Sequence, residues 1–482
     1  MKKLNRKNLH LDSKLPIKVV QFGEGNFLRA FVDFSFQQLN KKVDFNAGIA
    51  VVQPIEKGLI NMLNNQDGLY TLFQNGIKNG KEIQTKELIT NIVKGIDPYI
   101  HFKEYLQLSK EEDLEFIISN TTEAGIAFDP LDRPNMQPPN SFPAKLTILL
   151  YERFNFFNGD TSKGLTIIPC ELINYNANSL KEIILKYIEI WDLEIDFKNW
   201  IIKYNYFHNT LVDKIVPGYP KNQIENFNAQ LDYQDDLIVT AEPFFLWVIE
   251  GDDILKEKLP FDKTDLNVKI VDNMQPFRTR KVRILNGAHT AMVPFSILYG
   301  NSTVKETIEN DFTGEFIEKA VYDEIIETLD LEKEELNNFA DEVFDRFRNP
   351  FIKHNLSSIA LNSISKFKVR VLPSLLKYIE VNKKIPMHLT YSFACLVQFY
   401  KGEWKGNKLP VQDSNEIIDV FSKIWTLTNT SKITEVILKN HYFWGQDLNL
   451  IEGLPQAMTI ALKEIKKKGI EQGFINFKKK YK

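Results

Sequence analysis

The stretch KVVQFGEGNFLRAF, Lys18 to Phe31, decides which fold this chain can adopt. Lys18 to Phe22 predicts a short buried strand, Gly23-x-Gly25 a tight turn, and Asn26 to Leu39 a helix with apolar residues at helical spacing. In a dinucleotide site, this order lets the glycine backbone approach a pyrophosphate that lies on the helix N-terminus. Leu28 stands where the usual fingerprint has its third glycine, so the motif alone also fits an ordinary strand-to-helix turn.

The length and composition indicate a globular protein of at least two domains. The chain has 482 residues, of which 43% are hydrophobic and 26% are charged, with a net charge of −3. Such a balance gives no general attraction to nucleic acid or to an anionic membrane, so we expect neither as a partner. An anionic ligand would need a local group of basic residues.

Cysteine and histidine usage restricts the location and the chemistry. The chain has only two cysteines, Cys170 and Cys395, which fits a reducing compartment, so we expect a cytoplasmic protein. Met1 to Pro16 lacks the apolar core of a signal peptide, and no stretch approaches the roughly 20 apolar residues of a membrane span. Seven scattered histidines without an HExxH or CxxC motif make a metal site unexpected.

The first half of the chain alternates strand-like and helix-like segments. Short apolar strands separated by helices indicate a mostly parallel sheet covered on both faces. Asn-Gly pairs within YTLFQNGIKNGKEIQ suggest a hairpin inserted into this pattern. The fold class is therefore α/β, with an N-terminal Rossmann-like doubly wound sheet that carries insertions. The strands expected after the first are Ala47–Pro54, Leu114–Asn120, Leu165–Glu171 and Leu237–Pro243.

The second half predicts a mostly α-helical domain. From Thr279 onward, long helical patterns dominate. The simplest partition is an α/β domain over residues 1–272, which would bind the dinucleotide, and a mostly helical substrate domain over residues 273–482, with the site in the cleft between them. The expected helices include Val304–Leu329, Glu334–Arg346, Val369–Glu380 and Glu416–Trp425.

The segment RTRKVRILNGAHTAMVPF, residues 278–295, carries candidate chemistry. On an α-helix, Lys281, Asn286 and His289 would lie on one side, within roughly 140° of one another around the axis. A lysine can act as general base if its pKa falls from about 10.4 toward neutrality. Asparagine amides can donate to an oxygen that gains charge. The same spacing also fits a helix with a solvated lysine and an Asn-Gly turn, because lysine and asparagine are common surface residues.

These motifs together resemble the mannitol dehydrogenase family of polyol-specific long-chain dehydrogenases. The family carries a Lys-x4-Asn-x2-His signature and a glycine turn of the form GxGNFxRA, both present here. The resemblance continues through TTEAGI, PCELINYNANSL, NTLVDKIVP, AEPFFLWVIE and RFRNPFIKH, in the same succession. Several ordered motifs over nearly the whole chain are a far stronger signal than the glycine turn alone.

Within this family, the chain most resembles the branch that interconverts D-tagaturonate and D-altronate in hexuronate catabolism. The similarity to this branch lies in the segments QFGEGNFLRAF, PCELINYN and SFPAKLT. The resemblance implies zinc-independent hydride transfer between NAD and a secondary alcohol of a small sugar acid. A fructuronate reductase, a mannitol-type polyol dehydrogenase and a NAD-binding sensor without activity remain alternatives.

The resemblance also implies roles for individual residues. Lys281 matches the catalytic general acid/base, and Asn286 and Asn176 match the asparagines that polarise the reacting oxygen. His289 and Asp213 match positions that contact the substrate.

One departure from the family pattern concerns the substrate. Polyol enzymes carry Asp-x3-Arg-x7-Lys after the Asn-Pro motif, whereas the matching residues here are His354, Ser358 and Lys366. The arginine is lost, which argues against plain mannitol. Lys366, with Lys353 as a weaker candidate, is the expected partner of a substrate carboxylate, although a lysine is only a point charge.

A second departure concerns the cofactor. A carboxylate at the end of the second strand normally binds the adenosine ribose and selects NAD, but Gln53 stands there. Thr121 and Glu123 follow the strand beside which the nicotinamide should lie, although Glu123 could equally be a helix N-terminal carboxylate. The predicted cofactor-binding residues are Gly23, Gly25, Asn26, Phe27, Gln53, Thr121 and Glu123.

Overall fold

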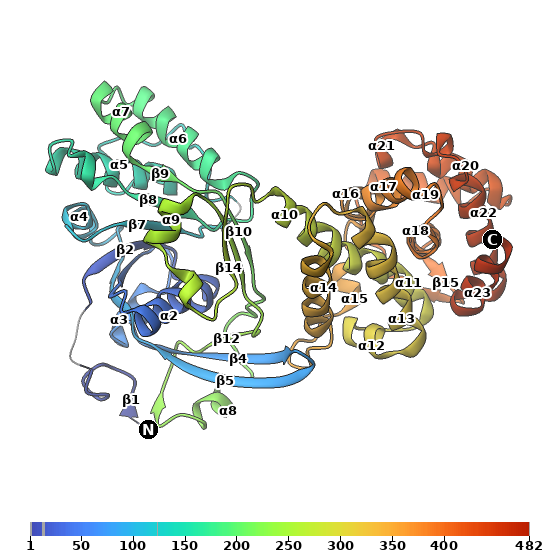
Figure 1. The fold of residues 1–482 in the computed structure, drawn as a ribbon, viewed down its shortest axis with the longest axis horizontal. Helices are drawn as coiled ribbons and strands as arrows, with labels where there is room; N and C mark the ends of the chain where they lie inside the picture. The colour runs from blue at the N-terminus through green and yellow to red at the C-terminus, as the bar shows by residue number, and fades with distance from the viewer. Residues whose placement is uncertain (1, 12–14, 123, 482) are drawn as a thin grey trace. The chain divides into compact units, whose positions relative to one another are not determined.

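The structure, a computed structural model, describes residues 2–11, 15–122 and 124–481, and these form two compact units. The first unit comprises Met1–Gly76 and Glu82–Met274, and the second comprises Ile77–Lys81 and Gln275–Lys482. No helix in the described ranges is long and apolar enough to cross a membrane. Figure 1 shows the helices and strands of the two units.

The first unit is built on a six-stranded sheet with the order β6-β3-β2-β7-β8-β9. All neighbouring strands run parallel. This is the 3-2-1-4-5-6 order of dinucleotide-binding folds, in which the order of adding strands to the sheet reverses between the first and fourth strands. The predicted α/β, doubly wound architecture is therefore confirmed. The strands are β2 (Ile17–Phe22), β3 (Gly48–Val52), β6 (Ile92–Ile96), β7 (Phe116–Ser119), β8 (Thr166–Pro169) and β9 (Tyr206–Phe207).

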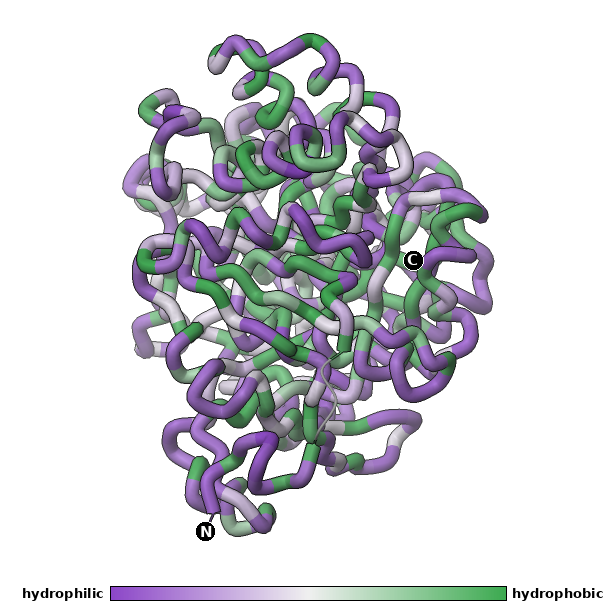
Figure 2. Tube along the Cα trace, turned by 90° about the vertical axis from the view of Figure 1, so that its left-hand side faces the viewer, coloured by the Kyte–Doolittle hydropathy of each residue, from purple (hydrophilic) through white to green (hydrophobic). Residues whose placement is uncertain are grey.

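Both faces of this sheet are buried, which explains why its strands are continuously apolar. Val19 and Ile118 belong to one hydrophobic cluster, whereas their neighbours Val20 and Ile117 belong to another on the opposite face. Figure 2 shows hydrophobic segments in the interior of the trace. The first cluster includes side chains of α2 (Phe34–Val43) and α3 (Ile60–Asn65), and the second includes side chains of α4 (Phe102–Gln107), α5 (Phe142–Phe156), α6 (Asn176–Ile190) and α7 (Ile195–Tyr204).

One of the predicted strands lies outside the central sheet. The strand expected at Leu237–Pro243 is β12 (Val239–Ala241), which pairs with β4. Apolar periodicity identifies a strand but does not say which sheet it joins. The sequence analysis missed β6 and β9, the two edge strands of the central sheet, and β14 (Val268–Val271), which pairs with β13.

The predicted hairpin is present. β4 (Tyr70–Lys78) and β5 (Lys81–Ile89) are neighbours in a three-stranded sheet. Their turn residues Asn79 and Gly80 have φ values of 53° and 71°, as a two-residue type I′ turn requires. The remaining elements of the unit are β1 (Lys2–Lys3), β10 (Thr210–Asp213), β11 (Tyr233–Gln234), β13 (Leu246–Glu250), α8 (Ile224–Asn228) and α9 (Asp253–Lys258).

The second unit is mostly helical, as predicted. α11 (Gly287–Tyr299) and α18 (Met387–Phe399) pack together, and nearly all their side chains are buried. A helix that is apolar all round belongs in the centre of a bundle. The other elements are α10 (Gln275–Lys281), α12 (Val304–Glu309), α13 (Asp311–Lys319), α14 (Lys333–Phe347), α15 (Leu356–Ile359), α16 (Ser363–Arg370), α17 (Leu372–Asn382), α19 (Asn415–Ile424), α20 (Thr430–Leu438), α21 (His441–Trp444), α22 (Leu454–Lys468), α23 (Ile470–Tyr481), β15 (Glu403–Trp404) and β16 (Asn407–Lys408).

Two of the long predicted helices are wrong as single helices. The pattern at Val304–Leu329 breaks at Asn310, whose extended backbone ends α12 and whose side chain caps α13 by accepting from the Thr313 amide at 3.0 Å. The pattern at Val369–Glu380 breaks at Val371, between α16 and α17. The break at Asn310 is capped by a side chain, whereas no side chain in the described ranges caps the one at Val371, and the apolar periodicity of the sequence runs across both.

Candidate functional site

The turn after β2 is fixed by its first glycine. Gly23 has a φ of +120°, and a Cβ at this position would lie 2.9 Å from Leu28 Cδ1 and 3.0 Å from the Asn120 carbonyl oxygen. Only glycine accepts both this backbone and this contact. Gly25 has an ordinary φ of −66° and no atom within 4 Å of its missing Cβ. The space in front of Gly25 is therefore open.

A continuous helical segment follows the turn. It consists of α1 (Asn26–Leu28), a π-helical stretch η1 (Arg29–Asp33) and then α2. Among the described residues, no side chain caps the first turn, so its N–H groups are left for another acceptor. Leu28, which replaces the third glycine, is buried beneath Gly23. An anion can be held here by backbone N–H groups, because the helix dipole also favours negative charge.

A buried arginine holds the glycine turn in place. Arg29 is only 2% exposed, and its Nε donates to the Glu24 carbonyl at 3.1 Å. Its other nitrogens donate to the Leu237 carbonyl at 2.6 Å and to Asn26 Oδ1 at 2.7 Å. The Asn26 side chain is thereby turned toward the protein. Arg29 is part of the GxGNFxRA motif, but the sequence analysis predicted no role for it.

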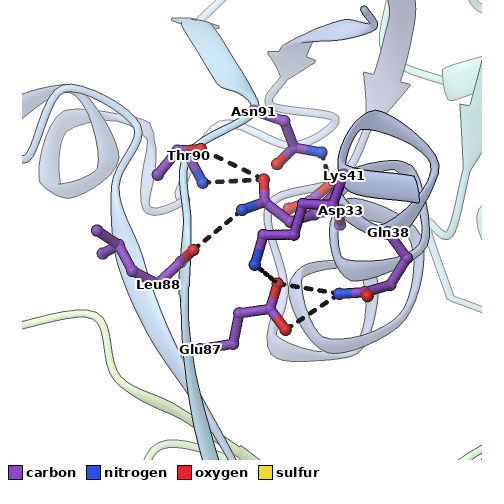
Figure 3. Close-up of polar contacts among 8 residues, drawn as sticks. Asp33, Gln38, Lys41, Glu87, Leu88, Thr90 and Asn91 are labelled. Atoms are coloured by element: carbon purple, nitrogen blue, oxygen red, sulfur yellow. Dashed lines mark hydrogen bonds and ion pairs between the residues drawn. The ribbon is translucent and has the colours of Figure 1, made fainter. Parts of the chain in front are cut away.

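Asp33 ends the π-helical stretch as a buried carboxylate. Its Oδ2 accepts from the Tyr70 hydroxyl at 3.0 Å, and Asn91 donates to its carbonyl at 2.8 Å. Burial raises the pKa of Asp33 to about 7, against the opposing effects of Tyr70 and Arg29. The next helical turns are tied to β5 through Gln37, Gln38 and Lys41 (Figure 3), so the helix that begins at the glycine turn is anchored along its length.

The loops after β3 and β7 complete the carboxyl edge of the sheet. Gln53 is 3% exposed, and its Nε2 donates to the Glu56 carbonyl at 3.1 Å. The Thr121 amide and hydroxyl donate to Glu171 Oε1 at 2.9 and 3.0 Å. Burial raises the pKa of Glu171, whereas these hydrogen bonds lower it. Glu171, which the sequence analysis missed, thus fixes the loop after β7, while Glu123 lies outside the described residues.

Asn176 is held entirely within the first unit. It is fully buried at the start of α6, and its Nδ2 donates to the carbonyls of Pro169 and Glu171 at 2.9 and 3.1 Å. Its Oδ1 accepts from the Thr210 amide at 3.0 Å. These bonds join the ends of β8 and β10, so the amide supports the backbone, and its role in polarising a substrate oxygen stays a prediction. Asp213 is the buried last residue of β10.

In the second unit, the predicted helix around Lys281 contains a π-helical stretch. Lys281 ends α10, η5 (Val282–Asn286) follows, and α11 begins at Gly287. The sequence analysis placed both residues on one side of a helix by assuming α-helical geometry throughout. A π-helix has i→i+5 hydrogen bonds, and five residues separate Lys281 from Asn286. One wide turn therefore stacks these two residues on the same side.

His289, on the following α-helical turn, lies in an aromatic setting. Its ring centroid is 4.5 Å from that of Phe347 and 4.9 Å from that of His354. Burial, and then the nearby Arg346, lower the pKa of His354. His354 stands where the polyol enzymes carry aspartate, and the structure brings this position beside His289.

Lys366 lies on α16 with its Nζ donating to the Ile359 carbonyl at 2.9 Å. Burial, followed by Arg370, lowers its pKa, while Asp413 opposes this shift. Its role as partner of a substrate carboxylate stays a prediction. Within the described ranges, no three His, Cys, Asp or Glu side chains are grouped so that they could hold a metal ion.

Comparison with known proteins gives matches along nearly the entire chain. The model of the mannitol dehydrogenase Rossmann domain matches residues 17–263, and that of the mannitol dehydrogenase C-terminal domain matches residues 273–466. Altronate oxidoreductase of Bacillus subtilis (strain 168) is 45% identical over 474 residues, which cover 98% of this chain and 97% of that protein. Altronate oxidoreductase of Bacteroides thetaiotaomicron is 42% identical over 472 residues, 98% of each chain.

Solved structures share the fold. A substrate-free D-sorbitol dehydrogenase superposes with a TM-score of 0.80 at 20% identity and covers 95% of each chain. Mannitol 2-dehydrogenase of Pseudomonas fluorescens superposes with a TM-score of 0.66 at 17% identity, and the match covers 99% of this chain and 100% of that one. That structure is a ternary complex with NAD and D-mannitol. A Rossmann unit followed by a helical unit, with these relatives, defines an oxidoreductase that acts on CH–OH groups. The chain belongs to the mannitol dehydrogenase family.

The two glycines of the turn should respond differently to alanine. Gly23→Ala forces a side chain into a positive φ and against Leu28, so we expect a loss of roughly 1–3 kcal/mol in the free energy of unfolding. Gly25→Ala is the matched control and should change it by less than about 0.5 kcal/mol, because space and backbone both accept a methyl group. Urea denaturation measures both. Equal destabilisation by the two variants would contradict this account of the turn.

Asp33 should make stability depend on pH. Its pKa rises from the ordinary 3.8 to about 7 on folding, so the folded state binds the proton more tightly. Stability contributed by this group is therefore full below about pH 4 and declines as pH rises toward 7, by roughly 2–4 kcal/mol. Asp33→Asn removes this titration. The difference in unfolding free energy between variant and wild type should grow in favour of the variant from pH 4 to 7, and a flat difference would refute the assignment.

Proposed function

We propose that this protein is a NAD-dependent oxidoreductase that interconverts D-tagaturonate and D-altronate in hexuronate catabolism. The observation that carries the proposal is the similarity to altronate oxidoreductases from several bacteria, 42–45% identical over nearly the full length of both chains. Relatives this similar over nearly the full chain share both the first unit and the helical second unit. We expect the substrate to contact the helical unit.

The cofactor residues fit a dinucleotide. The open space at Gly25 and the uncapped helix start at Asn26 suit a pyrophosphate, whose oxygens would accept from backbone N–H groups. Gln53 and Thr121 lie at the ends of β3 and β7, on either side of β2 in the sheet. Bound NAD would supply the hydride acceptor, and NADH the hydride donor. Phe27, in the first helical turn, would line the same site.

Lys281 is the proposed general acid/base. In the oxidation of altronate, its neutral Nζ accepts the proton of the reacting hydroxyl, and in the reduction of tagaturonate the protonated amine returns it. The amide of Asn286, one π-helical turn further, donates to the same oxygen as negative charge develops on it. The resemblance makes Asn176 the second proposed donor, and to reach this oxygen its Nδ2 would give up the hydrogen bond to the Pro169 or Glu171 carbonyl.

The remaining substrate contacts favour a sugar acid. We propose that His289 and Asp213 orient hydroxyl groups and that Lys366 pairs with the carboxylate. His354, beside His289, takes the place of the aspartate of polyol enzymes. Replacing a fixed carboxylate by an imidazole removes a negative charge that would repel an anionic substrate.

A substrate panel tests the proposed reaction. Oxidation of D-altronate, D-mannonate and D-mannitol is measured with NAD and with NADP, and reduction of D-tagaturonate and D-fructuronate with NADH and NADPH. We expect the highest kcat/KM for the altronate and tagaturonate pair with NAD and NADH. Equal or better activity with mannitol or mannonate would contradict the proposed substrate.

Removing the Lys281 amine should abolish the chemistry but not cofactor binding. Lys281→Ala is expected to lower kcat by roughly 10³-fold or more, because the proton loses its acceptor, while the Kd for NADH changes by less than about threefold. Lys305→Ala serves as control, since Lys305 is an exposed lysine paired with Glu309 on α12. Turnover of Lys281→Ala near the wild-type value would refute the assigned role.

A further inference from the structure

The carboxylate of Glu24 lies inside the glycine turn, between Gly23 and Gly25. The residue is 8% exposed, and its Oε1 accepts from the Leu59 amide at 3.1 Å. In the described part of the chain, no side chain donates a hydrogen bond to this carboxylate. Leu59 belongs to the loop after β3, so Glu24 reaches across from the end of β2 to the end of the neighbouring strand.

Glu24 and Gln53 meet at Gly58. A Cβ added to Gly58 would collide with both Glu24 Oε1 and Gln53 Oε1, so the two oxygens flank one point on the loop after β3. The amide nitrogen of Gln53 is turned away, toward the Glu56 carbonyl. The end of the second strand of such a sheet is where a carboxylate normally binds the adenosine ribose. Here the strand ends in an amide, but a carboxylate reaches the same place from the glycine turn.

Charged groups of both signs lie near Glu24. Burial, and more weakly Asp97 at the end of β6, raise the pKa of Glu24, while the Leu59 amide and Arg29 lower it. The Arg29 guanidinium already donates to two carbonyls and to Asn26. Lys57 extends from the loop as an exposed side chain. A solvated lysine is screened by water, whereas a nearly buried carboxylate acts at close range.

We propose that Glu24 determines the choice between NAD and NADP, by accepting hydrogen bonds from the adenosine ribose hydroxyls and by repelling a 2′-phosphate. The inference deepens the proposed function, on which it rests for the cofactor but not for the substrate. A carboxylate accepts from a diol without adjustment, whereas a phosphate brought beside it adds like charge in a partly buried place. Gln53, an amide, supplies no such repulsion.

The test compares Glu24→Gln with a matched control, Glu56→Gln. Both substitutions remove one carboxylate and keep the shape of the side chain, but Glu56 is exposed on the loop after β3. Binding of NADH and NADPH is measured by fluorescence titration, without substrate. We expect wild type to prefer NADH and Glu24→Gln to shift the ratio of the two Kd values toward NADPH by about tenfold or more, with less than about threefold change in Glu56→Gln.

Thermal unfolding checks that the variants are folded. If Glu24→Gln does not fold, Glu24→Ser, which leaves the Leu59 amide to water, is measured in its place. A wild type that binds NADPH as well as NADH, a ratio unchanged in the Glu24 variant, or a larger shift in Glu56→Gln would each overturn the inference. The titration uses no sugar acid, so its result does not depend on the substrate. Failure to oxidise altronate would refute the proposed substrate, while a shifted ratio of the Kd values for NADH and NADPH would still support the role of Glu24.

Discussion

The positive φ of Gly23 is the backbone constraint on which the arrangement of the first unit depends. β2 lies in the middle of the sheet, and the chain must leave it beside the Asn120 carbonyl without a side chain in the way. Because the turn passes so close to the neighbouring strand, the helix that follows starts at the sheet edge, and its first N–H groups face the space in front of Gly25. A bulkier residue at Gly23 would move the helix start and the anion site together.

The turn and the neighbouring loops are held by buried polar side chains that donate hydrogen bonds to backbone carbonyls. Arg29 binds the carbonyls of Glu24 and Leu237, and Asn176 binds those of Pro169 and Glu171. Each of these side chains is almost completely buried and would be costly to leave without partners. Rigidity at the edge of the sheet therefore comes from buried side chains that bind backbone carbonyls.

Much of the fold could be predicted from the sequence, because apolar periodicity and glycine placement are local signals. They predicted β2, β3, β7 and β8, the Asn79-Gly80 turn and the helical second unit. They could not assign β12 to a sheet, since pairing is decided by residues far apart in the chain. The roles of Arg29 and Glu171 were missed for the same reason. In a sequence, a buried arginine cannot be told from a surface arginine until its partners are known. Likewise, the sequence places Gln53 after β3 but does not reveal that the Glu24 carboxylate lies beside it.

The π-helical stretch between Lys281 and Asn286 changes what a sequence signature means. In an α-helix, a spacing of five leaves two side chains roughly 140° apart around the axis, whereas the wider turn of a π-helix brings them closer together. The spacing in Lys-x4-Asn is therefore a property of the backbone as much as of the two side chains. A shortened copy with three intervening residues on a regular α-helix would present the same pair on one face. Different spacings can thus encode one arrangement of functional groups, and a search for related sites by fixed spacing would pass over such equivalents.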